Sequence, residues 1–149
     1  MFYPHFIFIG DYIDKGENSK DTLVFLCWLE KQYKCTFLTG NHEYLWLKME
    51  EDDLETQNYL LKYGGKRTMI SMKANCIWVA KQELIENFGD FFLNLKDFWM
   101  NEKFIAVHSG IDPDFFNTGI ENIPLSKLLF NRYDFLKIRK LYQNKFKVI

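Results

Sequence analysis

The stretch that decides the fold class is FIFIGDYIDKG at residues 6–16, followed along the chain by CTFLTGNHE at residues 35–43. Each begins with a short apolar, β-rich run and reaches a glycine, which is typical of a buried parallel strand that leads into a loop. Between them, residues 19–33 carry apolar side chains at helical spacing, with Ser19 as the expected N-cap and Asp21 in the first turn. Strand, helix and strand predict a right-handed βαβ unit and therefore an α/β fold.

The rest of the chain predicts further helices, one hairpin and a last strand. The helices are expected at residues 42–49, 57–63, 66–72, 81–93 (with a break near Gly89) and in part of 125–141, and the hairpin strands at 97–100 and 103–107. Another buried strand is expected at residues 146–149. We expect the helices to pack on one face of the sheet and residues 1–149 to form one domain.

Composition excludes several classes of protein. The 149 residues are 48% hydrophobic and 26% charged, the balance of a soluble globular domain. A net charge of -1 without a basic stretch argues against nucleic acid as a partner, and the longest apolar run, residues 23–29, is too short to span a membrane. Residues 1–9 do not resemble a signal peptide, and three cysteines without a Cys-x-x-Cys pair (Cys27, Cys35 and Cys76) predict reduced core residues in a cytoplasmic protein.

Polar clusters follow three of the predicted strands, at residues 10–16, 40–43 and 108–110. Because the carboxyl ends of neighbouring strands in an α/β sheet meet at one crevice, we expect these clusters to lie together. Their Asp, Asn and His side chains are the donors that suit a divalent ion such as Mn²⁺, Fe²⁺ or Zn²⁺. The sequence therefore indicates a metal site.

Each cluster also has a purely structural interpretation. Asp11 and Asp14 can stabilise a turn by accepting backbone hydrogen bonds. Asn41 can cap a helix that carries a surface histidine, His42. A single histidine such as His108 is more often a packed residue than a ligand. The coincidence of three such clusters at three strand ends favours the metal interpretation.

The motifs Gly-Asp-x-x-Asp-Lys-Gly at 10–16, Gly-Asn-His-Glu at 40–43 and Val-His-Ser-Gly at 107–110 resemble those of the calcineurin-like metallophosphoesterases, particularly the bacterial serine/threonine phosphoprotein phosphatases. The resemblance extends from Phe6 to the last residue and includes residues 60–68. It implies an α/β/β/α sandwich and hydrolysis of phosphomonoesters, such as phosphoserine and phosphothreonine in proteins. It also implies two divalent metal ions, with Mn²⁺ expected first and Fe²⁺ or Zn²⁺ as alternatives.

The resemblance assigns roles to individual residues. Asp11 would bridge the two metal ions, and Asn41 and His108 would supply part of the second ion's shell. His42 would be the general acid that protonates the leaving oxygen, oriented and kept charged by the carboxylate of Asp14.

Two basic residues match the family's phosphate-binding positions. Lys15 stands where the family usually has arginine, and lysine holds a phosphate as a point charge without arginine's planar fork. Arg132 resembles the second phosphate-binding arginine, although an exposed helix residue is an alternative interpretation.

Two family motifs are not found in these 149 residues: the opening strand that ends in Asp-x-His-Gly and the closing strand that ends in Gly-His. His5 is no substitute because no aspartate precedes it at the motif's spacing. By the resemblance, the first metal keeps only Asp11, so this chain by itself is expected to be weakly active or inactive. Two alternatives stay open: symmetrical hydrolysis of dinucleoside tetraphosphates, and an inactive fragment or pseudo-phosphatase that binds a partner.

Overall fold

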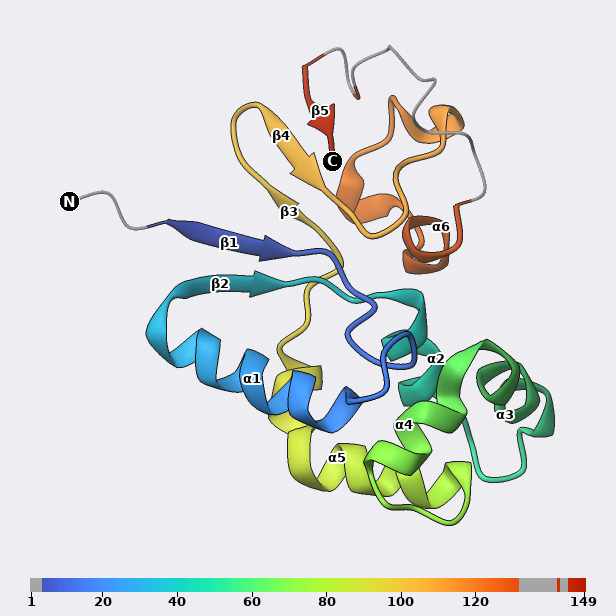
Figure 1. Cartoon of the computed structure of the whole chain (residues 1–149). Helices are drawn as coiled ribbons and strands as arrows, with labels where there is room; N and C mark the ends of the chain where they lie inside the picture. The colour runs from blue at the N-terminus through green and yellow to red at the C-terminus, as the bar shows by residue number, and fades with distance from the viewer. Residues whose placement is uncertain (1–3, 132–141, 143–144) are drawn as a thin grey trace.

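The computed structural model describes residues 4–131, 142 and 145–149 (Figure 1). Strands β1 (His5–Phe8) and β2 (Lys34–Phe37) pair in parallel, and helix α1 (Ser19–Gln32) connects them. The register runs from His5 opposite Lys34 to Phe8 opposite Phe37. The predicted pairing of strand, helix and strand is therefore confirmed.

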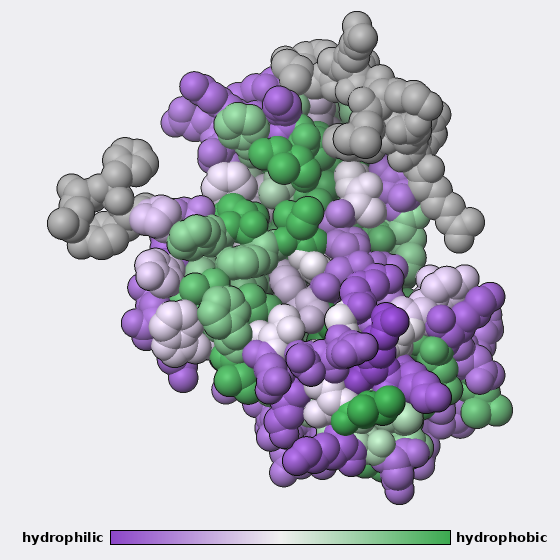
Figure 2. Space-filling view, in the orientation of Figure 1, coloured by the Kyte–Doolittle hydropathy of each residue, from purple (hydrophilic) through white to green (hydrophobic). Residues whose placement is uncertain are grey.

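Strand β1 is less buried than its sequence predicts. Phe6 is 40% exposed and Ile9, just after the strand, is 44% exposed. Among the described residues β1 pairs only with β2, so no second neighbouring strand covers its other edge. Figure 2 shows apolar residues gathered around the strands on this face, above a largely hydrophilic helical part.

Helices follow β2 and pack on one side of β1 and β2 (Figure 1). They are α2 (Asn41–Lys48), α3 (Leu54–Leu60), the π-helical turn η1 (Leu61–Gly65), α4 (Lys66–Ser71) and α5 (Ile77–Leu93). The main core lies here, among side chains such as Leu23, Trp46 and Leu84. The predicted break near Gly89 corresponds to a non-helical residue, Phe88, inside α5.

The C-terminal region, residues 97–131, 142 and 145–149, builds a second small sheet in the order β3-β4-β5. The predicted hairpin is present as β3 (Trp99–Met100) and β4 (Phe104–Ala106), and β5 (Lys147–Val148) pairs with β4 in parallel. The Asn101 side chain closes the hairpin turn by accepting hydrogen bonds from the N–H groups of Lys103 and Phe104. The turn therefore falls at the two polar residues predicted between the hairpin strands, Asn101 and Glu102, and the Asn101 side chain stabilises it.

Short helices cover the second sheet: η2 (Pro113–Phe115), η3 (Ile120–Asn122) and α6 (Leu125–Leu129). A second core packs there, with Ile105, Ile111 and Phe116 as fully or nearly fully buried members. Residues 132–141 of the expected last helix lie outside the described residues.

The two sheets are joined where Leu38 bridges to Lys96. There the N–H of Thr39 donates to the Lys96 carbonyl at 2.8 Å, and the N–H of Lys96 donates to the Phe37 carbonyl at 2.9 Å. We call residues 4–96, which build the first core, the N-terminal region. With helices on the outer side of each sheet, the chain has the predicted α/β fold in the α/β/β/α order of a sandwich (Figure 1).

The structure tests two expectations from composition: the burial of the three cysteines and the lack of a membrane-spanning segment. Cys27 and Cys35 are half-buried, but Cys76 is exposed, so its predicted burial is wrong. The reason is its position at the start of α5, where the chain turns at the surface. Within the described part of the chain, no helix has the length and apolar character needed to cross a membrane.

Candidate metal and general-acid site

The loop after β1 meets the loop after β2 and the segment after β4. Gly10 lies at this junction with φ of 96°, and a Cβ there would lie 2.5 Å from the Gly40 Cα and 2.7 Å from the His108 Nδ1. Only glycine combines this backbone angle with such a close approach. The three polar clusters that the sequence places at strand ends therefore converge.

The side chain of Glu43 fixes the backbone of the first loop. Its Oε2 accepts hydrogen bonds from the N–H groups of Asp11 at 2.8 Å and Gly40 at 3.0 Å, and its Oε1 accepts from the N–H of Tyr12 at 2.8 Å. Burial raises the pKa of the Glu43 carboxyl to about 7, although these N–H donors favour its ionised form. Glu43 was not among the residues predicted from the sequence to form the site. Its position in the motif Gly-Asn-His-Glu could have indicated a role, because a glutamate three residues after a helix N-cap can accept a hydrogen bond from the N-cap backbone.

The backbone of this loop is strained at both of its aspartates. Asp11 has φ of 60° and Asp14 has φ of 71°. Left-handed conformations are uncommon for residues other than glycine, and aspartate is among the few that tolerate them. The bonds to Glu43 hold Asp11 in this conformation.

Three predicted metal ligands lie together. The Nε2 of His108 is 3.0 Å from the Oδ1 of Asn41 and 3.5 Å from the Oδ1 of Asp11. The Nδ1 of His108 donates to the Ile9 carbonyl at 2.6 Å, so in the neutral ring Nε2 carries the lone pair. The side chains of Asp11 and His108 are 27% and 14% exposed, so the cluster is open to solvent.

This donor set fits a divalent cation. In the neutral form of His108, three lone-pair atoms from different segments face one another with no proton between them, and a cation at the centre relieves that repulsion. No group of three His, Cys, Asp or Glu side chains with metal-binding geometry occurs in the described ranges. The cluster here has two such side chains, Asp11 and His108, and its third donor is the amide of Asn41. These three donors match the ligands predicted for the second of the two metal ions. For the first ion, Asp11 is the one ligand that was predicted in this chain.

A buried acid–base pair lies beside the cluster. The Nδ1 of His42 donates to the Oδ2 of Asp14 at 2.6 Å, and the two side chains are 3% and 0% exposed. Trp46, one turn after His42 on α2, donates its Nε1–H to the same oxygen at 2.9 Å. Thr68, on α4, donates its hydroxyl to the other oxygen of Asp14 at 2.6 Å.

Trp46 and Thr68 were missed by the sequence analysis. The spacing of four residues places Trp46 on the same face of α2 as His42, which was a usable signal. Thr68 lies in the stretch 60–68 that carries part of the family resemblance, but nothing in that stretch indicates a bond to Asp14. The expected cap, Ser19, is instead the first residue of α1, and its hydroxyl contacts the Thr68 Oγ1 at 2.8 Å.

The predicted phosphate-binding residues have different outcomes. Lys15 is exposed next to Asp14, and Arg67 of α4 donates from Nη1 to its carbonyl at 3.2 Å. A hollow of about 450 Å³ beside this contact has three cationic residues among the seven that line it: Lys62, Lys66 and Arg67. Arg132 lies outside the described residues.

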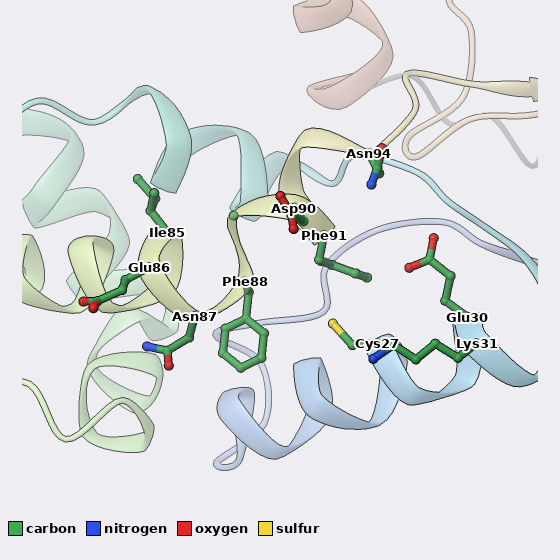
Figure 3. Close-up of a pocket in the computed structure, with 11 residues that line it drawn as sticks. Cys27, Glu30, Lys31, Ile85, Glu86, Asn87, Phe88, Asp90, Phe91 and Asn94 are labelled. Atoms are coloured by element: carbon green, nitrogen blue, oxygen red, sulfur yellow. The ribbon is translucent and has the colours of Figure 1, made fainter.

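Two other features lie away from the site. A cavity of about 400 Å³ opens between α1 and the bend of α5, with Cys27, Phe88 and Asp90 among its lining residues (Figure 3). It contains none of the predicted site residues. At the opposite end of β1, the Nε2 of His5 contacts the Thr36 hydroxyl at 3.0 Å. His5 is therefore remote from the loop that follows the strand.

Comparison with known proteins agrees with this geometry. The family model for calcineurin-like phosphoesterases matches residues 3–147. A Caenorhabditis elegans protein named "Putative serine/threonine-protein phosphatase C27B7.6" is 28% identical over 111 residues, which cover 72% of this chain and 20% of the relative. A Schizosaccharomyces pombe protein named "Putative serine/threonine-protein phosphatase C22H10.04" is 29% identical over 119 residues, which cover 74% of this chain and 31% of the relative.

The chain thus spans less than a third of the length of these two relatives. No solved structure matches it significantly. The family match extends over almost the whole sequence, from the segment before β1 to β5, and so includes all three strand-end clusters. This chain belongs to the calcineurin-like phosphoesterase family.

Proposed function

We propose that this chain is a metal-dependent phosphoesterase that hydrolyses phosphomonoesters, with phosphoserine and phosphothreonine in proteins as the substrate class. The proposal rests on one observation: a candidate metal-binding cluster and a candidate general acid lie next to each other. A cluster of lone-pair donors (Asp11, Asn41 and His108) lies next to a buried histidine–aspartate pair (His42 and Asp14). The names of the two relatives support the choice of protein substrates.

The donor cluster would hold a divalent ion through Asp11, Asn41 and His108. Mn²⁺ is the first choice, and Fe²⁺ and Zn²⁺ accept the same donors. Two such ions, when bound, supply charge stabilisation for the phosphoryl oxygens and a nucleophile derived from water. The bond from the His108 Nδ1 to the Ile9 carbonyl fixes the ring so that Nε2 faces Asn41 and Asp11. The Glu43 bond to the Asp11 backbone holds the loop that carries the Asp11 carboxylate.

His42 would act as the general acid. Its Nδ1 proton is held by Asp14, so the other ring nitrogen, Nε2, is the one available to the substrate. As the bond between phosphorus and the ester oxygen breaks, the proton on Nε2 passes to that oxygen, and hydroxide, formed from water by loss of a proton to solvent, bonds to phosphorus. His42 then regains a proton from solvent. The carboxylate of Asp14 stabilises the charged imidazole before this transfer.

Lys15 and Arg132 would hold the phosphoryl oxygens. Lys15 is exposed immediately after the loop aspartate, and its ammonium group supplies charge without a fixed orientation. We therefore expect weak discrimination among phosphomonoesters at this position.

The direct test is hydrolysis by the purified 149-residue chain with excess Mn²⁺, comparing a phosphoserine peptide, p-nitrophenyl phosphate and diadenosine tetraphosphate. We expect slow turnover of the peptide, because the first metal keeps only Asp11, and we expect His42→Ala to lower it at least about 100-fold, since general acid catalysis contributes about 10²–10⁴-fold. The matched control is His5→Ala, which removes a histidine outside the site. Faster cleavage of diadenosine tetraphosphate than of the peptide would favour the dinucleotide activity instead.

Measuring metal binding together with activity distinguishes an enzyme with an incomplete metal site from a protein that does not catalyse hydrolysis. Titration of the chain with Mn²⁺ by calorimetry is expected to give one site, since only Asp11 remains for the other ion. Folded protein that binds Mn²⁺ but cleaves none of the three substrates would overturn the proposed catalysis and support a pseudo-phosphatase. Two tight sites would show that the first ion's shell is completed by ligands that we have not identified.

A further inference from the structure

The carboxylate of Asp14 has more hydrogen-bond donors than its histidine partner supplies. Its Oδ2 accepts from the Nδ1 of His42, and its Oδ1 accepts from the hydroxyl of Thr68 at 2.6 Å. The Nε1–H of Trp46 is shared between the two oxygens, at 2.9 Å from Oδ2 and 3.1 Å from Oδ1. Three different donors therefore hold a side chain that is completely buried. With Oδ1 taken by Thr68, the plane of the carboxylate is fixed and Oδ2 faces His42.

Counting protons sets the direction of each bond to Thr68. A hydroxyl has one hydrogen, and the Asp14 carboxylate can only accept it, so Thr68 donates to Oδ1. The Thr68 oxygen then accepts the N–H of Asp14 at 3.0 Å and the hydroxyl of Ser19 at 2.8 Å. The single proton and both lone pairs of this hydroxyl are in use, which leaves Thr68 one orientation.

The backbone explains how α4 comes so close to Asp14. Gly64, which precedes α4, has φ of 119°, and a Cβ there would lie 2.3 Å from the Asp14 carbonyl oxygen. Only glycine allows this contact, and it brings the first turn of α4 against the aspartate loop. Thr68 is buried at the end of that approach.

We propose that Thr68 is a positioning residue for proton transfer: its hydroxyl orients the Asp14 carboxylate so that His42 presents its proton to the leaving oxygen. The inference rests on the proposed role of His42 as the general acid. Without the hydroxyl, Oδ1 and the Asp14 N–H both lose a partner, and the terminal torsion of an aspartate turns easily. The contact of 2.6 Å between His42 and Asp14 would then loosen.

The kinetic test compares two substrates whose leaving groups differ in whether they must be protonated. Alkoxide departure from phosphoserine requires protonation, whereas p-nitrophenolate leaves without it. For Thr68→Val, which keeps the side chain's shape, we expect kcat with Mn²⁺ to fall about tenfold or more on a phosphoserine peptide and less than about threefold on p-nitrophenyl phosphate. Thr68→Ser, which retains the hydroxyl, should restore the wild-type ratio of the two rates.

The matched control is Thr36→Val. Thr36 also places a hydroxyl against a histidine, His5, but outside the site. This variant should keep the wild-type ratio, which separates the loss of a particular hydroxyl from the loss of any threonine–histidine contact.

A second measurement needs neither metal nor turnover. The chain has three histidines, so the imidazole ¹⁵N and N–H signals of His42 can be assigned by comparison with His42→Ala. At fixed pH in metal-free protein, we expect a slowly exchanging Nδ1 proton in wild type, Thr68→Ser and Thr36→Val. In Thr68→Val the exchange of this proton should be at least several-fold faster.

The outcomes are separable from those of the proposed function. If wild type cleaves neither substrate, the catalytic proposal fails, and the proton-exchange comparison still decides whether Thr68 orients the pair. Equal losses on both substrates in Thr68→Val, or a Nδ1 proton that exchanges as in wild type, would overturn the positioning role. If Thr68→Val does not fold, Trp46→Phe removes another donor from Asp14 while keeping an aromatic ring, and the same preferential loss on phosphoserine is expected.

Discussion

The N-terminal and C-terminal regions contribute to the site in different ways. The N-terminal region holds the pair of His42 and Asp14 entirely within its own core, with Trp46 and Thr68 as further partners. From the described residues of the C-terminal region, one proposed site residue comes, His108, which reaches across the junction to the Ile9 carbonyl and to Asn41. The general-acid pair therefore depends on one core, whereas the metal cluster depends on how two cores fit together.

The largest expected effect concerns the pair of His42 and Asp14, which lies entirely within the N-terminal region. Asp14→Asn removes the charge that supports His42, so we expect kcat on a phosphoserine peptide to fall by about 10²-fold or more. Mn²⁺ affinity, measured by calorimetry, should change little because Asp14 is not one of the clustered ligands. A large loss of Mn²⁺ binding in this variant would mean that the acid pair and the metal cluster are not independent.

The second effect tests the part that both regions build. His108→Ala removes one of three donors, and we expect Mn²⁺ affinity to fall at least about tenfold, since even a ligand's outer partners are worth about 10–100-fold. The Nδ1 proton of His42 should exchange as in wild type. His5→Ala is the matched histidine control for the calorimetry. Retained Mn²⁺ affinity in His108→Ala would contradict the proposed shell.

The third effect concerns the pH dependence of stability. The folded-state pKa of Glu43 is about 7, raised by burial above its ordinary value of 4.5. The folded protein therefore binds a proton that the unfolded chain has lost, so the free energy of unfolding should fall by about 2 kcal/mol as pH rises from about 5 to about 7.

Denaturant titrations of metal-free protein at several pH values measure this slope. Glu43→Gln cannot ionise and should lose that part of the slope. It should also be less stable than wild type, because an amide offers one acceptor oxygen to three N–H donors. An identical slope in the variant would show that another group causes it.

The smallest effect concerns the cationic hollow of Lys62, Lys66 and Arg67. Arg67→Ala removes the contact with the Lys15 carbonyl and one positive charge near the loop. We expect KM for a phosphopeptide with acidic neighbours to rise by less than about tenfold, with kcat unchanged, since an exposed charge contributes about 0–1 kcal/mol. An equal change for a peptide with neutral neighbours would argue against a charge effect.

Sequence patterns predicted the helices and strands better than their burial. The helix at residues 19–33 and the parallel strand pair match α1, β1 and β2 closely, because apolar periodicity and glycine-terminated strands are local signals. Burial of β1 was overestimated, since exposure depends on which neighbouring strands cover it. The role of Ser19 was also wrong, because its hydroxyl finds a partner 49 residues away in Thr68.

The sequence by itself determined the family and the donors of the candidate site, because Asp11, Asp14, Asn41, His42 and His108 follow strand ends in recognisable motifs. Tertiary structure alone decided which residues support them. Glu43 bonds to a loop more than thirty residues earlier in the chain, and Thr68 reaches Asp14 across 54 residues. Such contacts form when separate elements pack together. The pattern of residues within one segment does not indicate which residue of a distant segment will contact it.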